Sequence, residues 1–496
     1  MRSLPFYMKR KLLTSLILAA SASAALGQLQ LKQGDHISIV GNTLADRLQL
    51  DGTLEAMIQQ AFPQLDLSVR NLGFAADELT VRQRSENFGS PDQWLTKTKT
   101  DVVFAFFGFN ESFQGPEGVD KFKTDLEKFL KETKGANYSG KGAPRVVLFS
   151  PIAHENLKNP DFPDGTQTND RLRYYIEAMQ QVAAANGVPF VDLFKPSQEA
   201  YATAKEPLTV NGIHLKDTGY AALAPAIFKS VFGKDAPAPS PKLLEAVNEK
   251  NWQWHLRYRT VDGFNVFGGR SQLTFPNGKG GPSIKNYTVM QEEMSQRDVL
   301  TENREKRVHA IAKGGDLKVE DSDLPPVTVV KSNKPGPLED AAHPYLSGEE
   351  TIAKIKLHEG LKINLFADEK QFPELVNPVQ MAWDTAGRCW VSAWPSYPEQ
   401  TPTSKVGDKL LIFEDTNHDG KADKCTTFLD HLNSPTGFQF YKDGVLVMQA
   451  PDLWFVRDTN GDGKADTKEV VLNGMTPPTR TTRRMPCVSI PAARRI

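Results

Sequence analysis

The chain has 496 residues, with 59 lysines and arginines against 60 aspartates and glutamates, and 39% of its residues are hydrophobic. This length implies about two to four domains, and the composition is that of a globular protein rather than a disordered one. The near-neutral charge argues against a polybasic nucleic-acid binder. Three cysteines, Cys389, Cys425 and Cys487, are too few for a disulfide framework or a four-cysteine zinc site.

Residues 1–27 have the features of a secretory signal peptide. Basic residues between Arg2 and Lys11 precede an apolar run that begins at Leu12 and ends in small residues near Gly27. The run is short for a membrane span, and no other stretch approaches about 20 consecutive apolar residues. We therefore expect an exported protein, periplasmic or extracellular, with no transmembrane segment after cleavage. A buried N-terminal helix or a membrane anchor is the alternative.

Residues 32–233 alternate between short apolar runs and helical patterns. Near-continuous apolar strands that alternate with helices are typical of a parallel sheet covered on both faces. The sequence therefore predicts one α/β domain of about 200 residues. The expected strands are at residues 36–40, 67–72, 101–107, 145–150 and 189–193, and helical patterns lie at 118–133 and 170–186.

A Pro-rich stretch at residues 235–241 precedes two helical patterns, at 242–259 and 287–313. We interpret residues 234–345 as a helical connector. The aromatic residues of the first helix are expected to pack in its interface rather than to bind a ligand.

Residues 346–475 contain a repeat whose two copies are 43 residues apart, beginning at Asp415 and Asp458. A pair of predicted strands precedes each copy, at 380–383 and 389–392 and again at 437–440 and 445–448. This period is typical of β-propeller blades. The region therefore predicts about two blades, whereas a closed propeller needs roughly four to eight.

The stretch 476–496 contains five arginines and no acidic residue. A disordered tail is one interpretation. We favour a frameshift or truncation that replaced further blades, because an interrupted repeat array is otherwise hard to explain.

Four polar positions in the α/β region suggest chemistry. Thr43, Gly73 and Asn110 each follow a predicted strand, and His214 lies near the end of the region. Because the carboxyl ends of parallel strands meet at one edge of the sheet, these residues could share a pocket. A hydroxyl nucleophile needs a base such as His214. The backbone N–H groups of Thr43 and Gly73 and the Asn110 side-chain amide could then stabilise an oxyanion.

These positions resemble the four blocks of the SGNH, or GDSL-type, hydrolase family. Gly41-Asn42-Thr43-Leu44 stands at the Gly-Asp-Ser-Leu block, and Gly73 matches the second block. Gly108-Phe109-Asn110 matches the Gly-x-Asn block, and Asn211-Gly212-Ile213-His214 occupies the Asp-x-x-His block. The resemblance covers residues 32–233 and implies a flavodoxin-like three-layer sandwich with esterase or acylhydrolase activity.

Two residues depart from the family pattern. Thr43 replaces the nucleophilic serine, and its extra methyl group stiffens the side chain and crowds the line of attack. Asn211 replaces the aspartate that orients the histidine, a change that lowers kcat by about 10⁴-fold in serine proteases. A backbone carbonyl or another carboxylate could orient His214 instead; Asp77, Glu78 and Glu111 lie in neighbouring loops. A hydrolase with a threonine nucleophile, a degenerate domain that binds an acyl or glycan ligand, and different chemistry in the same pocket all remain open.

The whole arrangement also resembles large membrane-bound dehydrogenase proteins of the Planctomycetes–Verrucomicrobia type. Residues 257–265 and 375–381 look like segments of that family, whose propeller is similar to quinone-dependent sugar dehydrogenases. This chain has about two blades and no Cys-x-x-Cys-His haem motif, so the resemblance implies no redox activity for it.

The repeated Asp-Thr-Asn-x-Asp-Gly-Lys-Ala-Asp loops predict calcium binding. They place side-chain oxygens at positions 1, 3, 5 and 9, a carbonyl at 7 and glycine at 6, which suits Ca²⁺. A twelfth-position glutamate, Glu469, exists only in the second loop. Metal-free turns between strands are the alternative, and a structural role is expected for any bound ion. The predicted ligands are Asp415, Asn417, Asp419, Lys421 (carbonyl) and Asp423 in the first loop, and Asp458, Asn460, Asp462, Lys464 (carbonyl) and Asp466 in the second.

The leading hypothesis is therefore an exported hydrolase of acyl or acetyl esters, with a small molecule or a glycan as substrate. Thr43 would be the nucleophile, His214 the base and Asn211 its orienting residue, and Gly73 and Asn110 would line the oxyanion hole without a cofactor. A non-catalytic glycan-binding module and a fragment of a quinone-dependent dehydrogenase are the alternatives.

Overall fold

The computed structural model describes residues 28–160, 162–260, 263–331, 336–338, 344–397, 407–449 and 452–473. The signal peptide expected at residues 1–27 and the atypical tail at 476–496 lie outside these residues. None of the helices in the described ranges has the length and apolar character needed to span a bilayer. The chain divides into two compact units, and each is described by itself.

The first unit is built on five parallel strands. They follow the order β2-β1-β3-β4-β5, and Ile39 pairs with Asn71 on one side and with Phe104 on the other. The order reverses between β1 and β3, which is where open α/β folds place their sites. The prediction of a parallel α/β sheet is confirmed. The strands are β1 (His36–Gly41), β2 (Ser68–Asn71), β3 (Val102–Phe106), β4 (Arg145–Phe149) and β5 (Phe190–Val191).

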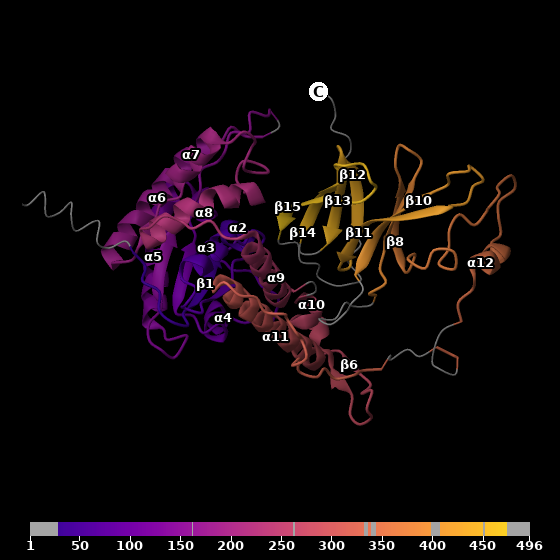
Figure 1. The fold of residues 1–496 in the computed structure, drawn as a ribbon, viewed down its shortest axis with the longest axis horizontal. Helices are drawn as coiled ribbons and strands as arrows, with labels where there is room; N and C mark the ends of the chain where they lie inside the picture. Colours follow the sequence, from indigo (N-terminus) through magenta and orange to yellow (C-terminus); the bar gives the residue numbers. More distant parts are fainter. Residues whose placement is uncertain are drawn as a thin grey trace, which may run out of the picture. The chain divides into compact units, whose positions relative to one another are not determined.

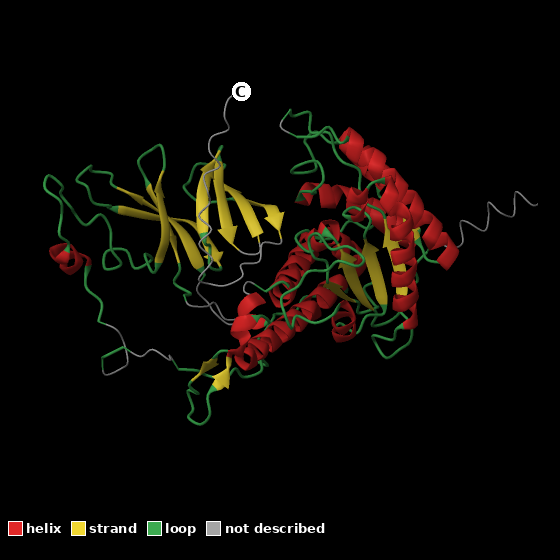
Figure 2. Cartoon of the chain, turned by 180° about the vertical axis from the view of Figure 1, so that it is seen from behind, coloured by secondary structure: helices red, strands yellow, loops and turns green. Residues whose placement is uncertain are grey.

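Helices cover both faces of this sheet (Figures 1 and 2). The helices are α2 (Thr43–Arg47), α3 (Thr53–Ala61), α4 (Pro91–Lys97), α5 (Val119–Gly135), α6 (Thr166–Asn186), α7 (Phe194–Thr203) and α8 (Asp217–Phe232), with the short 3₁₀ helices η1 (Glu111–Gln114) and η2 (Pro116–Gly118).

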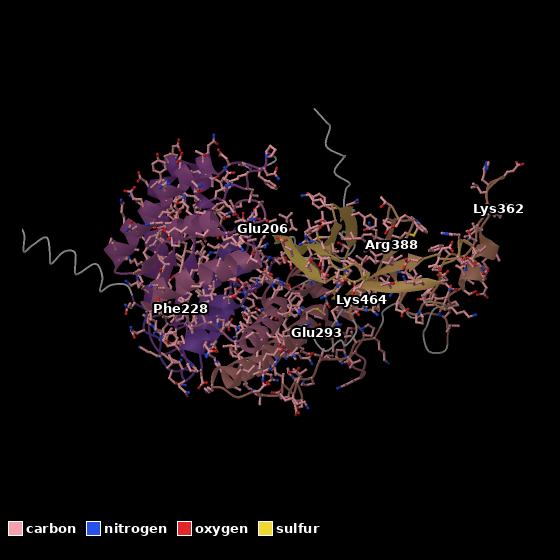
Figure 3. All side chains as sticks on the ribbon, turned by 45° about the horizontal axis from the view of Figure 1, so that its top comes forward. Glu206, Phe228, Glu293, Lys362, Arg388 and Lys464 are labelled. Atoms are coloured by element: carbon pink, nitrogen blue, oxygen red, sulfur yellow. The ribbon has the colours of Figure 1, made fainter. Side chains whose placement is uncertain are left out.

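Both faces of the sheet are apolar, which explains the continuous apolar runs in the sequence. Phe104 on β3 belongs to the same core cluster as Phe228 of α8. Figure 3 labels Phe228 among the side chains of this unit. Directly after β3, Phe107 contacts Phe129 of α5, with ring centroids 5.6 Å apart. Every residue of β3 is buried, so no position on this strand favours a polar side chain.

Two long helices of the expected connector pack against this unit. They are α9 (Pro241–Tyr258) and the second half of α11 (Asn286–Ala312). Residues up to Tyr258, and again Asp298–Asp323, belong to the same compact unit as the parallel sheet. The structure therefore differs from the separate connector expected at residues 234–345.

Side chains of α9 and α11 bind the free edge of β2, which pairs only with β1. The Leu67 carbonyl accepts a hydrogen bond from His309 Nε2 (2.8 Å), and the Val69 carbonyl accepts one from Lys250 Nζ (3.1 Å). The Asn71 carbonyl accepts one from Trp254 Nε1 (2.7 Å). These alternate carbonyls would otherwise be an unpaired strand edge.

The same interface buries two ion pairs. The fully buried Lys250 ammonium lies 2.7 Å from Glu55, and Arg70 donates two hydrogen bonds to Glu305, at 2.5 and 3.0 Å. Ser68 also donates to Glu305 (2.8 Å). Burial by itself would raise the pKa of Glu305, but the Arg70 charge and its hydrogen bonds hold that pKa at about 2. Burial has the opposite effect on the Lys250 ammonium and lowers its pKa. The negative charge of Glu55 raises that pKa and offsets part of the effect.

The second unit contains two four-stranded antiparallel sheets, in the orders β11-β10-β9-β8 and β12-β13-β14-β15. The Gln380 side chain joins them, because it donates to the Phe438 carbonyl (2.9 Å) and accepts from the Phe438 N–H (2.8 Å). The sheets agree with the two predicted repeats, whereas a propeller stays a prediction. The strands are β8 (Pro378–Trp383), β9 (Cys389–Ala393), β10 (Asp408–Glu414), β11 (Lys424–Leu432), β12 (Gly437–Tyr441), β13 (Gly444–Gln449), β14 (Asp452–Arg457) and β15 (Thr467–Asn473).

Shorter elements complete the described chain. They are α10 (Gly263–Val266), η3 (Gly269–Gln272), β6 (Thr274–Phe275), β7 (Ile284–Lys285) and α12 (Gly348–Lys354).

Replacing Glu305 by glutamine tests the buried network. We expect Glu305→Gln to lower the free energy of unfolding at pH 7 by about 3–5 kcal/mol, because Arg70 keeps its charge and loses its counter-ion. The exposed Glu127 on α5 provides the control, and Glu127→Gln should change stability by no more than about 0.5 kcal/mol. Urea unfolding followed by circular dichroism measures both.

The pH dependence gives a second check on the network. The pKa of Glu305 in the folded state, about 2, is below its ordinary value of 4.5. Its contribution is therefore complete above the ordinary pKa and is lost as the pH falls towards 2. The difference between wild type and Glu305→Gln should shrink over that range. Equal stability of the two proteins at pH 7 would contradict the assignment.

Candidate active site

The candidate nucleophile lies where the chain leaves β1. Gly41 has φ +133°, and a Cβ there would lie 2.0 Å from the Phe106 carbonyl oxygen, so this close crossing of β3 requires glycine. The Asn42 side chain then caps α2 by accepting from the Leu44 N–H (3.2 Å). Thr43 is the first residue of α2 and is half-buried. Within the described ranges, neither its hydroxyl nor its N–H makes a hydrogen bond.

Gly73 does not have the role that the sequence predicted. Its N–H donates to Asn71 Oδ1 (2.8 Å), so this proton is not directed at a substrate. A Cβ on Gly73 would lie 2.5 Å from the Asp46 nitrogen. The residue is therefore glycine because the turn after β2 presses against the backbone of α2, and the expected oxyanion donor is corrected to a packing residue.

Asn110 follows β3 and precedes η1. The turn before it is held by the buried Glu111 carboxylate, which accepts from the N–H groups of Gly108 (2.8 Å) and Leu79 (2.9 Å). Burial raises the pKa of Glu111. The half-buried Asn110 side chain makes no hydrogen bond to any residue that the structure describes. Its amide is thus available as a donor.

His214 is half-buried in the loop between α7 and α8. Asn211 does not orient its ring as predicted, because Asn211 Oδ1 accepts instead from the backbone N–H groups of Ile213 (3.3 Å) and His214 (3.1 Å). The buried Nδ1 of His214 has no partner among the described residues. Burial, together with the nearby charge of Arg47, lowers the pKa of His214 to about 4. The imidazole is therefore neutral at pH 7.

Two hydrogen bonds bring α2 and the histidine loop together. Tyr220 of α8 donates to the Leu44 carbonyl (3.1 Å), and the Arg47 side chain donates to the Leu215 carbonyl (3.2 Å). These contacts hold the helix that begins at Thr43 beside the residue that follows His214. No direct hydrogen bond joins the Thr43 hydroxyl to the His214 ring in the described part of the chain.

Other carboxylates expected as alternatives to Asn211 have different partners. Asp77 forms a two-point ion pair with Arg84, at 2.8 and 2.7 Å. Glu111 binds backbone N–H groups, as described above. Among the described residues no carboxylate, Glu78 included, hydrogen-bonds the His214 ring, so this candidate base is not part of a carboxylate-supported triad.

The histidine loop is supported from the loop that follows β4, by a residue that was not among the predicted site residues. The buried Glu155 carboxylate accepts from the N–H groups of Leu208 (3.1 Å) and Thr209 (2.8 Å). Its own N–H donates to the Gly212 carbonyl (2.8 Å). The adjacent His154 ring packs so closely that a Cβ on Gly212 would lie 2.3 Å from its Nε2. The available signal was that these polar residues follow a strand of the same sheet.

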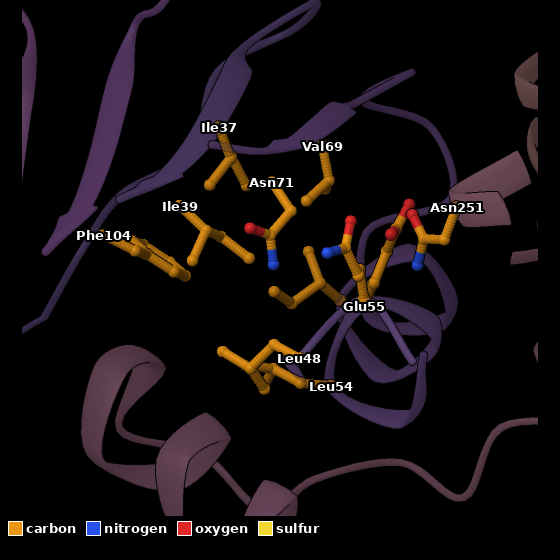
Figure 4. Close-up of a pocket in the computed structure, with 11 residues that line it drawn as sticks. Ile37, Ile39, Leu48, Leu54, Glu55, Val69, Asn71, Phe104 and Asn251 are labelled. Atoms are coloured by element: carbon orange, nitrogen blue, oxygen red, sulfur yellow. The ribbon is translucent and has the colours of Figure 1, made fainter. Parts of the chain in front are cut away.

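An internal cavity of about 20 Å³ lies between the sheet and α3. Figure 4 shows it bordered by Ile37, Ile39 and Phe104 of the sheet and by Leu48 and Leu54. This volume suits about one water molecule. The cavity belongs to the core and is too small for an ester substrate.

The two predicted calcium loops have matching hydrogen bonds. Asp415 accepts from the Gly420 N–H (2.8 Å), as Asp458 does from Gly463 (2.8 Å). The terminal carboxylates of both loops likewise accept from a threonine N–H at the second position. Among the described residues, no group of three or more acidic, histidine or cysteine side chains is arranged to hold a metal. Calcium at these loops stays a prediction.

Comparisons with known proteins separate the two parts of the chain. Residues 34–222 match the GDSL-like Lipase/Acylhydrolase family, and residues 347–485 match a domain of unknown function (DUF7133). The second match names no activity, so the resemblance to dehydrogenase proteins stays a prediction. No curated protein matches the chain.

Solved structures match part of the chain at low identity. A gut microbial diltiazem-metabolizing enzyme is 19% identical with a TM-score of 0.34; the match covers 42% of this chain and 49% of that one, about half its length. A catalytic mutant of Axe2, an acetylxylan esterase from Geobacillus stearothermophilus, is 18% identical with a TM-score of 0.32, covering 41% of this chain and 96% of that one. The family match and the parallel sheet agree with the resemblance seen in the sequence. The chain thus contains a GDSL-like lipase/acylhydrolase domain at residues 34–222.

Proposed function

We propose that this domain hydrolyses acyl or acetyl esters, with Thr43 as nucleophile and His214 as general base. The supporting observation is the pair of hydrogen bonds that ties α2 to the histidine loop, Tyr220 to Leu44 and Arg47 to Leu215. They hold an unengaged hydroxyl and a neutral imidazole at the same edge of the sheet. Export and a glycan-borne ester are further parts of the proposal, based on the sequence.

The reaction requires two acyl transfers. The Thr43 oxygen attacks the ester carbonyl carbon while its proton passes to a ring nitrogen of His214. The Thr43 N–H and the Asn110 amide stabilise the oxyanion. Collapse of the intermediate breaks the bond to the leaving alcohol, which takes the proton from His214. Water, deprotonated by His214, then attacks the acyl-threonine. The bond to the Thr43 oxygen breaks as that oxygen takes the proton back from His214, which releases the carboxylic acid and restores both groups.

The geometry predicts a slow enzyme. Gly73 N–H is engaged by Asn71, so two oxyanion donors remain of the three expected. The imidazolium formed in the reaction lacks a carboxylate partner, a defect that lowers kcat by about 10⁴-fold in serine proteases. The same features favour a second candidate function, a binding module that retains an ester or glycan without turnover.

Substitutions at Thr43 separate the two functions. With p-nitrophenyl acetate, we expect Thr43→Ala to lower kcat by about 10²-fold, because the nucleophile is lost from a site that already lacks the supporting carboxylate. Thr43→Ser should raise kcat, because it removes the methyl group that crowds the line of attack.

Thr124→Ala is the matched control, since that exposed hydroxyl only donates to the Asp120 carbonyl. An inert wild type with no gain in Thr43→Ser would contradict hydrolysis. Ligand binding measured by calorimetry would then support the binding module.

The pH profile tests the base. A base works in its unprotonated form, so kcat/KM should be constant at neutral pH and fall to half near pH 4, the pKa of His214. Circular dichroism at each pH separates this loss from acid unfolding. An inflection near 6.5 would show that His214 titrates as an ordinary exposed histidine or that another group is the base.

Calcium binding by the second unit has its own test. We expect isothermal titration of the full chain with Ca²⁺ to give two sites, and Asp415→Ala and Asp458→Ala to remove one each. Each aspartate is the first ligand position of its loop. Titration with Mg²⁺ controls for unspecific attraction to acidic loops. Absence of heat, together with an unchanged unfolding temperature in Ca²⁺, would identify metal-free turns.

A further inference from the structure

Helix α9 lies in a segment that neither family match covers, yet it binds the loop next to the candidate site. The Trp254 indole donates to the Asn71 carbonyl (2.7 Å), and the Tyr258 hydroxyl donates to the Leu72 carbonyl (3.0 Å). Both side chains are buried, and each contacts the Trp94 ring edge-on. α9 therefore fixes the backbone immediately before Gly73.

The backbone after Gly73 is held from the same place. Arg84 interacts with the Tyr258 side chain. Its guanidinium lies 3.7 Å over the ring of Phe74 and pairs with Asp77. Tyr258 thus restrains the Gly73 turn on both sides, directly through Leu72 and indirectly through Arg84.

The turn at Gly73 also positions α2. Asn71 Nδ2 donates to the Ala45 carbonyl (2.6 Å), and Gly73 packs against the Asp46 backbone without room for a side chain. The Phe74 N–H also donates to the Gly41 carbonyl (2.9 Å), at the end of β1. A shift of the turn would therefore move the short helix that begins at Thr43.

We propose that α9 is a positioning element of the hydrolase site and that Tyr258 is its principal positioning residue. The inference rests on the proposed function, because it concerns the placement of the Thr43 hydroxyl and N–H. Oxyanion stabilisation acts in the transition state and depends on donor placement to a fraction of an ångström. A displaced α2 therefore lowers kcat while substrate binding in the ground state changes little.

The test compares Tyr258→Phe with wild type in the full chain, using p-nitrophenyl acetate. We expect kcat to fall about tenfold and KM to stay within about twofold, with the midpoint of the pH profile unchanged because His214 is not touched. Tyr138→Phe is the matched control, since this buried hydroxyl donates to Asp92 and contacts neither the Gly73 turn nor α2. An active Tyr258→Phe with wild-type kcat, or an equal loss in Tyr138→Phe, would overturn the inference.

Hydrogen exchange keeps the inference testable if the wild type has no activity. Peptides covering residues 42–48 and 71–76 should exchange faster in Tyr258→Phe than in wild type, while peptides from α5 should not change. Faster exchange with an inert wild type would reject the proposed function and retain the positioning role. Unchanged exchange would reject the positioning role itself. Trp254→Phe, which removes the donor to Asn71 and part of the ring that packs on Trp94 and Tyr258, should give the same shifts if Tyr258→Phe does not fold.

Discussion

The first unit depends on hydrogen-bond donors for the β2 carbonyl groups that no neighbouring strand pairs. An edge strand buried under helices needs donors for these carbonyls, because an unpaired buried polar group is costly. Here one of the donors is the ammonium of Lys250, and a buried cation needs a counter-ion, which Glu55 provides. Arg70 donates to the same Val69 carbonyl (3.0 Å) and has Glu305 as its counter-ion. Residues 241–258 and 298–323 are consequently a structural part of the α/β unit.

Helix α2 transmits this packing to the candidate site. A five-residue helix has little stability of its own, so tertiary contacts decide where it lies. It receives them from the Asn71 side chain, from Tyr220 of α8 and from the carbonyl that follows His214. Thr43, the proposed nucleophile, is thus positioned by three segments that are distant in the chain.

The chemistry of the site follows from burial rather than from a complete triad. Desolvation keeps His214 neutral, which a general base requires, but a pKa near 4 also makes it a weak base at neutral pH. Asn211 stabilises the turn that presents the ring instead of the ring itself. The proposed threonine nucleophile beside an unsupported imidazole therefore favours either slow turnover or retention of a ligand.

The sequence by itself determined the elements and the order of the chemical groups. Buried strands such as β3 have no polar position, and the 43-residue repeat marks two antiparallel sheets, because both patterns are local. Only the tertiary structure decided the hydrogen-bond partners. The Gly73 N–H donates to Asn71 Oδ1, and Asn211 Oδ1 accepts from the backbone. The spacing of residues along the chain does not determine such contacts, because they depend on shifts of a few ångströms. The same holds for α9 and α11, whose ion pairs join residues 195 and 235 positions apart. The sequence does not show which charges will pair, because these residues come into contact only when the chain folds.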